Sequence, residues 1–151
     1  FFWYIPFSLL TYLKEVSILK NDYMNSSLEE LQNCVWKKPE YNSALITNCH
    51  RLRKIPLKDL SIENIRMLVG QKIGLKYLVP LALEFLENNY FCSGDFYNGD
   101  LLYAVLGIES DYWDKNYALF QRLSDVMFNL EEDYKTYSKK ILPKWKKLFT
   151  K

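Results

Sequence analysis

Histidine, cysteine, glycine and proline are scarce in this chain, which contains one His, three Cys, five Gly and five Pro among 151 residues. A structural zinc site needs four close-set Cys or His ligands. The four candidates lie too far apart for the usual paired spacing: Cys34, Cys49, His50 and Cys92. We therefore expect no metal and no cofactor. We interpret the thiols as small buried hydrophobic side chains of a protein in a reducing compartment, the cytoplasm.

Long apolar runs and a strong net charge are also missing. Residues 1–13 are nearly all apolar, but crossing a bilayer takes about 20 such residues, so we expect no stable membrane span. Met24 precedes a capped helix start, which favours residues 1–23 as an N-terminal extension added by upstream translation or cloning. The cut end of a membrane segment and a helix or strand packed on the core are the alternatives. Residues 24–151 then form one domain.

Helix signals follow one another along the chain. The low glycine and proline content favours long elements, and 49% hydrophobic residues suffice for a core. Within the apolar run 75–86, Pro80 predicts that the regular helix starts near that residue. Residues 90–99 have the composition of a loop, and Gly107 is expected to end the following helix in a left-handed conformation. Candidate N-caps precede four segments: Ser26 or Ser27, Asn42 or Ser43, Ser61, and Asp100.

The clearest periodicity begins at Asp111. Apolar side chains recur there in steps of three and four, which predicts one amphipathic helix of seven or eight turns ended by Pro143. Its apolar positions are Trp113, Tyr117, Phe120, Leu123, Met127, Leu130, Tyr134, Tyr137 and Ile141. No alternating segment long enough for a strand is present. The predicted fold is all-α, a compact single-domain helical bundle with a long C-terminal amphipathic helix.

Charge is unevenly distributed although the net charge is only +2. Residues 1–83 carry 11 bases and 7 acids, residues 84–133 carry 2 bases and 11 acids, and residues 134–151 carry 7 bases and no acid. The middle stretch therefore has a net charge of −9. Such a segment can attract a cationic partner.

Catalytic groups are few. Cys49 and His50 are adjacent, and neighbours on a helix project about 100° apart, which argues against a thiol–imidazole pair. Asp95 and Asp100 lack the regular oxygen spacing of a calcium loop. Residues 70–74 lack the Gly-Lys-Ser/Thr ending of a phosphate loop. We therefore expect neither an enzyme nor a small-molecule substrate, and seven lysines without arginine in residues 134–151 argue against specific nucleic-acid readout.

Several sequence blocks stand out when they are taken together. They are residues 28–31 (LEEL), Trp36, residues 49–57 (CHRLRKIPL), 60–71 (LSIENIRMLVGQ), 74–83 (GLKYLVPLAL) and 94–102 (GDFYNGDLL). In this order they resemble a helical family of contact-dependent growth inhibition immunity proteins of Gram-negative bacteria. The resemblance extends from about residue 27 to residue 106.

The resemblance implies a small cytoplasmic protein that binds and blocks the C-terminal toxin domain, expected to be a ribonuclease, of a large surface exoprotein. A nuclease site is cationic because it holds phosphates, so clustered acids and aromatics would suit its inhibitor. We infer a partner-binding surface made of Asp95, Tyr97, Asp100, Glu109, Asp111, Tyr112 and Trp113.

Two other hypotheses remain open. The lysine-rich tail, with Trp145 and Phe149, would suit a small RNA-binding accessory protein. A small enzyme would have to use Asp95 and Asp100 as acid and base, which requires both carboxylates to border one pocket.

Overall fold

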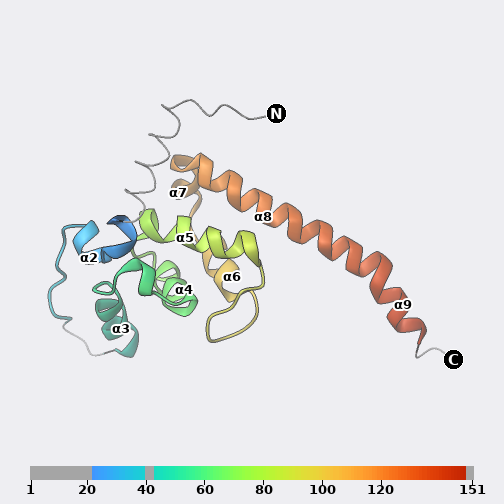
Figure 1. Ribbon diagram of the computed structural model, residues 1–151, viewed down its shortest axis with the longest axis horizontal. Helices are drawn as coiled ribbons and strands as arrows, with labels where there is room; N and C mark the ends of the chain where they lie inside the picture. Colours follow the sequence, from blue (N-terminus) through green and yellow to red (C-terminus); the bar gives the residue numbers. More distant parts are fainter. Residues whose placement is uncertain (1–21, 40–42, 149–151) are drawn as a thin grey trace, which may run out of the picture. The chain divides into compact units, whose positions relative to one another are not determined.

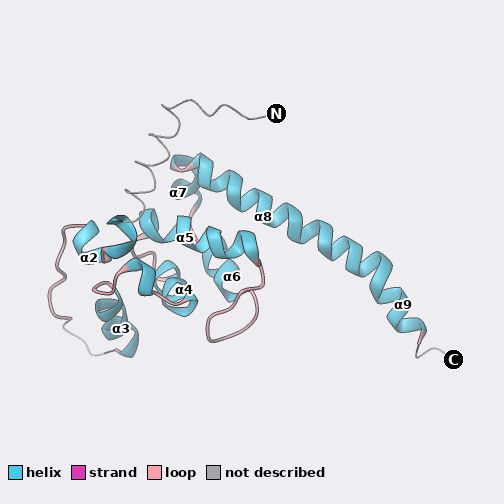
Figure 2. Cartoon of the chain, in the orientation of Figure 1, coloured by secondary structure: helices cyan, strands magenta, loops and turns pink. Residues whose placement is uncertain are grey.

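The computed structural model describes residues 22–39 and 43–148, and all regular secondary structure in these ranges is helical (Figure 2). No strand occurs in them, since Ser27 and Pro56 form only an isolated antiparallel bridge. The all-α prediction is confirmed. Contacts within the chain separate two compact units, residues 1–64 and 65–151. Residues 1–21 lie outside the described part, so the division into an extension and a domain remains a prediction.

Short helices make up the described part of the first unit. Ser27 Oγ accepts the Glu30 N–H while the Glu30 carboxylate accepts the Ser27 N–H at 2.7 Å, which is the predicted capping box. Ser43 Oγ accepts the Ile46 N–H, so this predicted cap is confirmed as well. The helices are α2 (Leu28–Leu31), α3 (Ala44–Leu52), the 3-10 helix η1 (Leu57–Asp59) and the first turn of α4 (Ile62–Gly70).

A buried arginine, Arg53, joins the segments of this unit. Its side chain is 1% exposed. The guanidinium donates to Gln32 Oε1 at 2.8 Å and to the Cys34 carbonyl at 2.9 Å, and it lies 4.0 Å from the centre of the Trp36 ring. The Arg53 carbonyl accepts the Glu29 N–H at 2.9 Å. These contacts hold the extended chain after α2 against the end of α3.

The second unit contains the remaining helices (Figure 1). Helix α5 packs against α6 and α8, and α7 packs against α8. The helices are α5 (Leu75–Asn88), α6 (Asp100–Leu106), α7 (Ser110–Lys115), α8 (Tyr117–Thr136), the π-helical turn η2 (Tyr137–Ile141) and α9 (Leu142–Lys147). The side chains of this unit that are less than 2% exposed are Ile65, Leu68, Val69, Leu78, Val79, Ala82, Leu83, Leu86, Leu101 and Val105.

Helix α5 corrects the predicted start at Pro80. The helix begins at Leu75, after Gly74 in a left-handed conformation with φ of 65°, and Pro80 lies inside it. Proline removes one N–H from the helix ladder. Burial on both sides of Pro80 offsets this loss, because Val79 and Leu81 are 0% and 6% exposed.

Gly107 follows α6 as predicted, but its φ of −79° and ψ of 2° are not left-handed. Its N–H donates to the carbonyls of Tyr103 and Ala104, both at 3.2 Å. The helix therefore ends by tightening its last turn, and that part of the prediction was wrong.

The predicted long C-terminal helix differs at both ends. It is interrupted at Asn116, whose side-chain Nδ2 donates to the Tyr112 carbonyl at 2.7 Å and so competes with the helix ladder. It also continues past Pro143 into α9. In η2 the Leu142 N–H donates to the Tyr137 carbonyl, and this wider turn relieves the clash between the proline ring and the preceding turn.

Candidate functional site

The loop of residues 90–99 is held from inside by one carboxylate, that of Asp100. Its Oδ1 accepts the Gly94 N–H at 2.7 Å and its Oδ2 accepts the Phe96 N–H at 3.2 Å. Arg66 Nε lies 3.7 Å from Oδ2, and the Arg66 guanidinium lies over the Phe96 ring at 4.5 Å. Asp100 is only 3% exposed. The loop therefore has a fixed backbone although it contains no regular structure.

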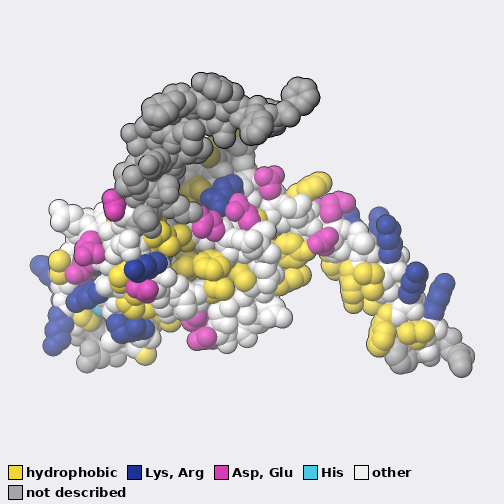
Figure 3. Space-filling model, in the orientation of Figure 1, with side chains coloured by type: hydrophobic (Ala, Val, Ile, Leu, Met, Phe, Trp, Pro, Cys, Tyr) yellow, Lys and Arg dark blue, Asp and Glu magenta, His cyan; other side chains and the backbone are white. Residues whose placement is uncertain are grey.

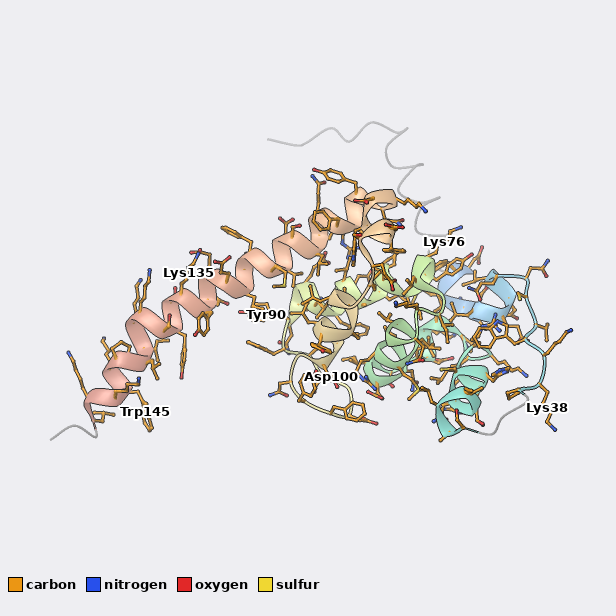
Figure 4. The ribbon with its side chains drawn as sticks, turned by 180° about the vertical axis from the view of Figure 1, so that it is seen from behind. Lys38, Lys76, Tyr90, Asp100, Lys135 and Trp145 are labelled. Atoms are coloured by element: carbon orange, nitrogen blue, oxygen red, sulfur yellow. The ribbon has the colours of Figure 1, made fainter. Side chains whose placement is uncertain are left out.

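This arrangement corrects the expected role of Asp100 as a helix cap. Asp100 is the first residue of α6, and the N-cap is Gly99 with a left-handed φ of 91°. Glycine reaches this conformation without strain. The Asp100 side chain is thereby turned back toward the loop (Figure 4).

Aromatic side chains cover the outer side of this loop. Phe96, Tyr97 and Tyr103 are 70%, 54% and 73% exposed. The rings of Tyr97 and Tyr103 meet edge to face, with 6.4 Å between their centres. A hollow of about 290 Å³ lies between them and the ends of α4 and α6, lined by Arg66, Gly70, Phe96, Tyr97, Tyr103 and Gly107. Tyrosine and other aromatic residues are common in binding hot spots.

Exposed acidic residues follow the lining residues of this hollow in the sequence. Glu109 forms an ion pair with Lys72. These two residues follow Gly107 and Gly70 of the hollow by two positions each. Asp111 is exposed two positions further, in the first turn of α7. The exposed residues Asp95, Phe96, Tyr97, Tyr103, Glu109 and Asp111 make up what we call the acidic–aromatic surface.

The predicted partner-binding residues thus divide into an exposed and a supporting group. Asp95, Tyr97, Glu109 and Asp111 are exposed. Tyr112 is half-buried and donates its hydroxyl to the Leu75 carbonyl at 3.2 Å, and burial raises the pKa of this phenol. The supporting residues, which do not form part of the exposed surface, are Asp100 and Trp113, 3% and 8% exposed.

Sequence reasoning missed two aromatic members of this surface. Tyr103 could have been found, because Leu102 and Val105 form the buried side of α6 and leave Tyr103 on the other side. Phe96 has no such signal, since its position depends on the contact with Arg66.

The remaining candidate groups form no recognisable catalytic site. Asp100 borders the hollow through a carboxylate already bonded to two N–H groups, and Asp95 is not among the residues that line this hollow. Cys49 is buried, which raises the pKa of its thiol, while the His50 ring packs edge to face against Trp36. Among the described residues, no three His, Cys, Asp or Glu side chains are grouped to hold a metal ion.

The expected burial of all three thiols was wrong in part. Cys34 is exposed and Cys92 is half-buried. Burial is the main cause that raises the pKa of the Cys92 thiol, and the nearby Asp100 carboxylate raises it further.

A family model of CDI immunity proteins matches residues 30–123. This range is more than half of the chain and contains the whole acidic–aromatic surface. The chain belongs to the CDI immunity proteins. CDI denotes contact-dependent growth inhibition, so the family suggested by the sequence blocks is confirmed.

The matched range ends within α8 of this immunity protein, and most of α8 together with η2 and α9 lies beyond it. No curated protein and no solved structure matches the chain. Within residues 22–39 and 43–148, no helix has both the length and the apolar character required to cross a membrane.

Proposed function

We propose that this chain binds the C-terminal toxin domain of a cognate CDI exoprotein in the cytoplasm and blocks its activity without catalysing a reaction. The family match over residues 30–123 is the observation that carries this proposal. A protein that protects its own cell in this way needs a specific surface for the toxin and no active site of its own. We propose that the toxin is a ribonuclease.

The acidic–aromatic surface is the proposed contact. Exposed rings of Phe96, Tyr97 and Tyr103 would supply apolar area, and the carboxylates of Asp95 and Asp111 would face cationic groups that hold RNA phosphates. Complementary charge speeds association and selects the correct partner. The rigid backbone around the loop reduces the entropy lost on binding.

Co-expression tests the function. Cells that make the toxin domain encoded beside this protein should grow when this chain is also made, and the two proteins should purify as a one-to-one complex. Growth arrest despite co-expression would refute the proposal. The ribonuclease assignment is tested separately by incubating the toxin domain with cellular RNA, with and without this chain.

Charge reversal tests the surface. Asp95→Lys with Asp111→Lys should slow association with the toxin domain by about tenfold at low salt, because two attractive charges become repulsive. The matched control is Asp59→Lys with Glu29→Lys, which gives the same change in net charge outside the surface. Equal association rates for the two pairs would place the contact elsewhere, while failure of all complexes to form would reject toxin binding itself.

The lysine-rich C-terminal segment supports a second candidate, an RNA-binding accessory protein. The six lysines between residues 135 and 147 are exposed. RNA binding at low salt that disappears on deletion of residues 144–151 would favour this function. Absence of RNA binding by the full chain would reject it.

A further inference from the structure

Helix α8, the turn η2 and α9 form a continuous helical segment from residue 117 to residue 147, with exposed apolar side chains along one side of its second half. Figure 3 shows hydrophobic side chains along one side of this segment and lysines along the other. Lys135 and Trp145 project from opposite sides in Figure 4. The exposed apolar positions are Tyr134, Tyr137, Ile141, Trp145 and Leu148, between 48% and 70% exposed.

A groove of about 800 Å³ lies beside the first half of the same segment. Leu123, 5% exposed, and Met127 come from α8, while Phe91 and Leu106, 53% and 49% exposed, come from the loop after α5 and from α6. The Tyr90 hydroxyl donates to Asp133 and so ties the loop after α5 to α8. A groove with such walls can receive the apolar side of a helix.

We propose that the occupant of this groove is α9 of a second copy of this chain, and that two copies pair through antiparallel α8–α9 segments. This inference is independent of toxin binding, because the segment lies mostly beyond the acidic–aromatic surface. In an antiparallel pair related by a two-fold axis, each copy offers its groove to the other copy and inserts its own α9 into the groove of the other copy.

Helical spacing defines the register of the pair. The apolar positions 120, 123, 127, 130, 134, 137 and 141 alternate in steps of three and four, which is the seam of a two-helix packing. With the two-fold axis between Tyr134 and Tyr137, Ile141 faces Leu130 of the second copy. Leu148 then faces Leu123, and Trp145 enters the groove beside Met127.

Charge complementarity selects this antiparallel arrangement. Residues 117–133 carry four acids and one base, whereas residues 135–148 carry six lysines and no acid. A parallel pair in register would place lysines against lysines, which is repulsive. In the antiparallel register, Asp133 of each copy lies beside Lys140 of the other, so the ion pair forms twice.

Sedimentation equilibrium of the full chain tests the proposal. Over about a hundredfold range of concentration, the mass should rise from one copy to two. Trp145→Ala should raise the dimer dissociation constant by about tenfold or more, since a large ring leaves the groove. A single-copy mass throughout the range for the unchanged chain would overturn the proposal.

A charge exchange tests the register. Asp133→Lys and Lys140→Glu should each weaken the dimer by about tenfold, and the double variant should recover most of the loss because both ion pairs return with reversed sign. Lys139→Glu is the matched control, since it makes the same change of charge at a neighbouring position that does not share a side with Lys140, and it should leave the dimer unchanged. If the double variant is weaker than either single variant, the antiparallel register is wrong.

If the groove binds something other than a second copy, the same measurements give different results, and each of these results would overturn the dimer proposal. A segment that covers the groove within its own chain gives a single-copy mass at all concentrations. A membrane surface gives a single-copy mass together with binding of the full chain to phosphatidylserine vesicles that Trp145→Ala abolishes. A groove that receives the toxin gives a single-copy mass and a Trp145→Ala variant that loses affinity for the toxin domain.

Discussion

Two buried charged side chains, Asp100 and Arg53, hold segments that have no regular structure. Each bonds to backbone or side-chain groups several residues away. Arg53 also lies over the Trp36 ring, and Arg66, the ion-pair partner of Asp100, lies over the Phe96 ring. Such residues are sensitive to truncation, because buried partners lose hydrogen bonds that water does not replace.

Asp100→Ala should lower the free energy of unfolding by about 3 kcal/mol, since the Gly94 and Phe96 N–H groups and Arg66 lose their acceptor. Urea denaturation measures the change. Asp111→Asn, at an exposed position, serves as the control and should stay within about 0.5 kcal/mol of the unchanged chain. Equal stability of the two variants would show that Asp100 does not hold the loop.

Arg53→Ala should cost about 3 kcal/mol as well, because two hydrogen bonds and the stacking on Trp36 are lost together. Thermal and urea unfolding would measure this loss. Arg51→Ala, two residues earlier at an exposed position, should change little. A small effect of Arg53→Ala would mean that the packing of α2 and α3 suffices without this residue.

These residue roles mark a limit of sequence reasoning. The caps at Ser27 and Ser43 were predictable, because each bonds to an N–H three residues ahead. Asp100 has the same local pattern, yet its side chain turns back to the preceding loop and meets Arg66, 34 positions earlier in the sequence. Spacing within one helix carries no information on such a contact.

At the scale of elements, burial decides where helices begin and end. Apolar residues on both sides of Pro80 keep α5 intact through the proline, and the wider turn η2 carries the C-terminal helix past Pro143. Conversely, Asn116 interrupts a segment whose apolar spacing is continuous. Periodicity therefore predicted that these segments are helical, but it predicted their boundaries less well, because local breakers and tertiary burial act in opposite directions. It also did not tell which apolar positions are buried, since Leu123 is 5% exposed whereas Tyr134 is 66% exposed.

Pro80→Ala should stabilise the second unit by about 2 kcal/mol, because alanine restores an N–H to the interior of α5 and relieves the proline clash, while the unfolded chain gains some freedom. The urea midpoint should rise. Pro143→Ala should give a smaller gain, since the wider turn η2 already relieves the clash between the Pro143 ring and the preceding turn. A lower midpoint for Pro80→Ala would contradict this account of α5.

The ion pair that joins α5 to α8 makes the free energy of unfolding depend on pH in the acidic range. Arg122 donates to both Glu87 oxygens, at 2.6 and 2.9 Å, and these bonds lower the pKa of Glu87 below its usual 4.5. Because folding lowers the pKa of Glu87, the ion pair contributes its full stabilisation at pH values above the pKa of Glu87 in the unfolded chain. This stabilisation is lost as the pH falls through the pKa of Glu87 in the folded chain. Glu87→Gln should therefore flatten the loss of stability below about pH 4.5, measured by urea denaturation at several pH values.

Arg122→Gln is the companion variant, since it removes the cause of the shift and leaves the carboxyl group. Arg122→Gln should also make the free energy of unfolding fall less steeply with decreasing pH in this range. Unchanged acid sensitivity in both variants would place the responsible carboxylates elsewhere, with Glu30 next in line because its bonds to Ser27 also lower its pKa.

At the scale of the whole molecule, charge is separated along the chain. The net −9 of residues 84–133 remains exposed at Asp95 and Asp111, although Lys72, Arg122 and Lys135 form ion pairs with some of the acids. In the lysine-rich end, Lys135 forms ion pairs with Glu131 and Glu132. Exposed carboxylates and exposed lysines thus belong to different stretches of the sequence.

Association with the toxin domain should therefore slow by about tenfold between roughly 20 and 200 mM salt, while dissociation changes less, because screening weakens long-range attraction before contact. Stopped-flow kinetics at a series of salt concentrations would measure both rates. An association rate independent of salt would show that aromatic contacts alone govern recognition.

The way Asp100 holds its loop bears on how new specificities could arise. Its carboxylate accepts the main-chain N–H groups of Gly94 and Phe96 and lies 3.7 Å from Arg66 Nε, so these contacts do not use the side chain of Tyr97. Exchanging Tyr97 would therefore leave both N–H bonds to Asp100 in place. Related immunity proteins could in this way carry a different recognition side chain at this position while the loop backbone keeps its support.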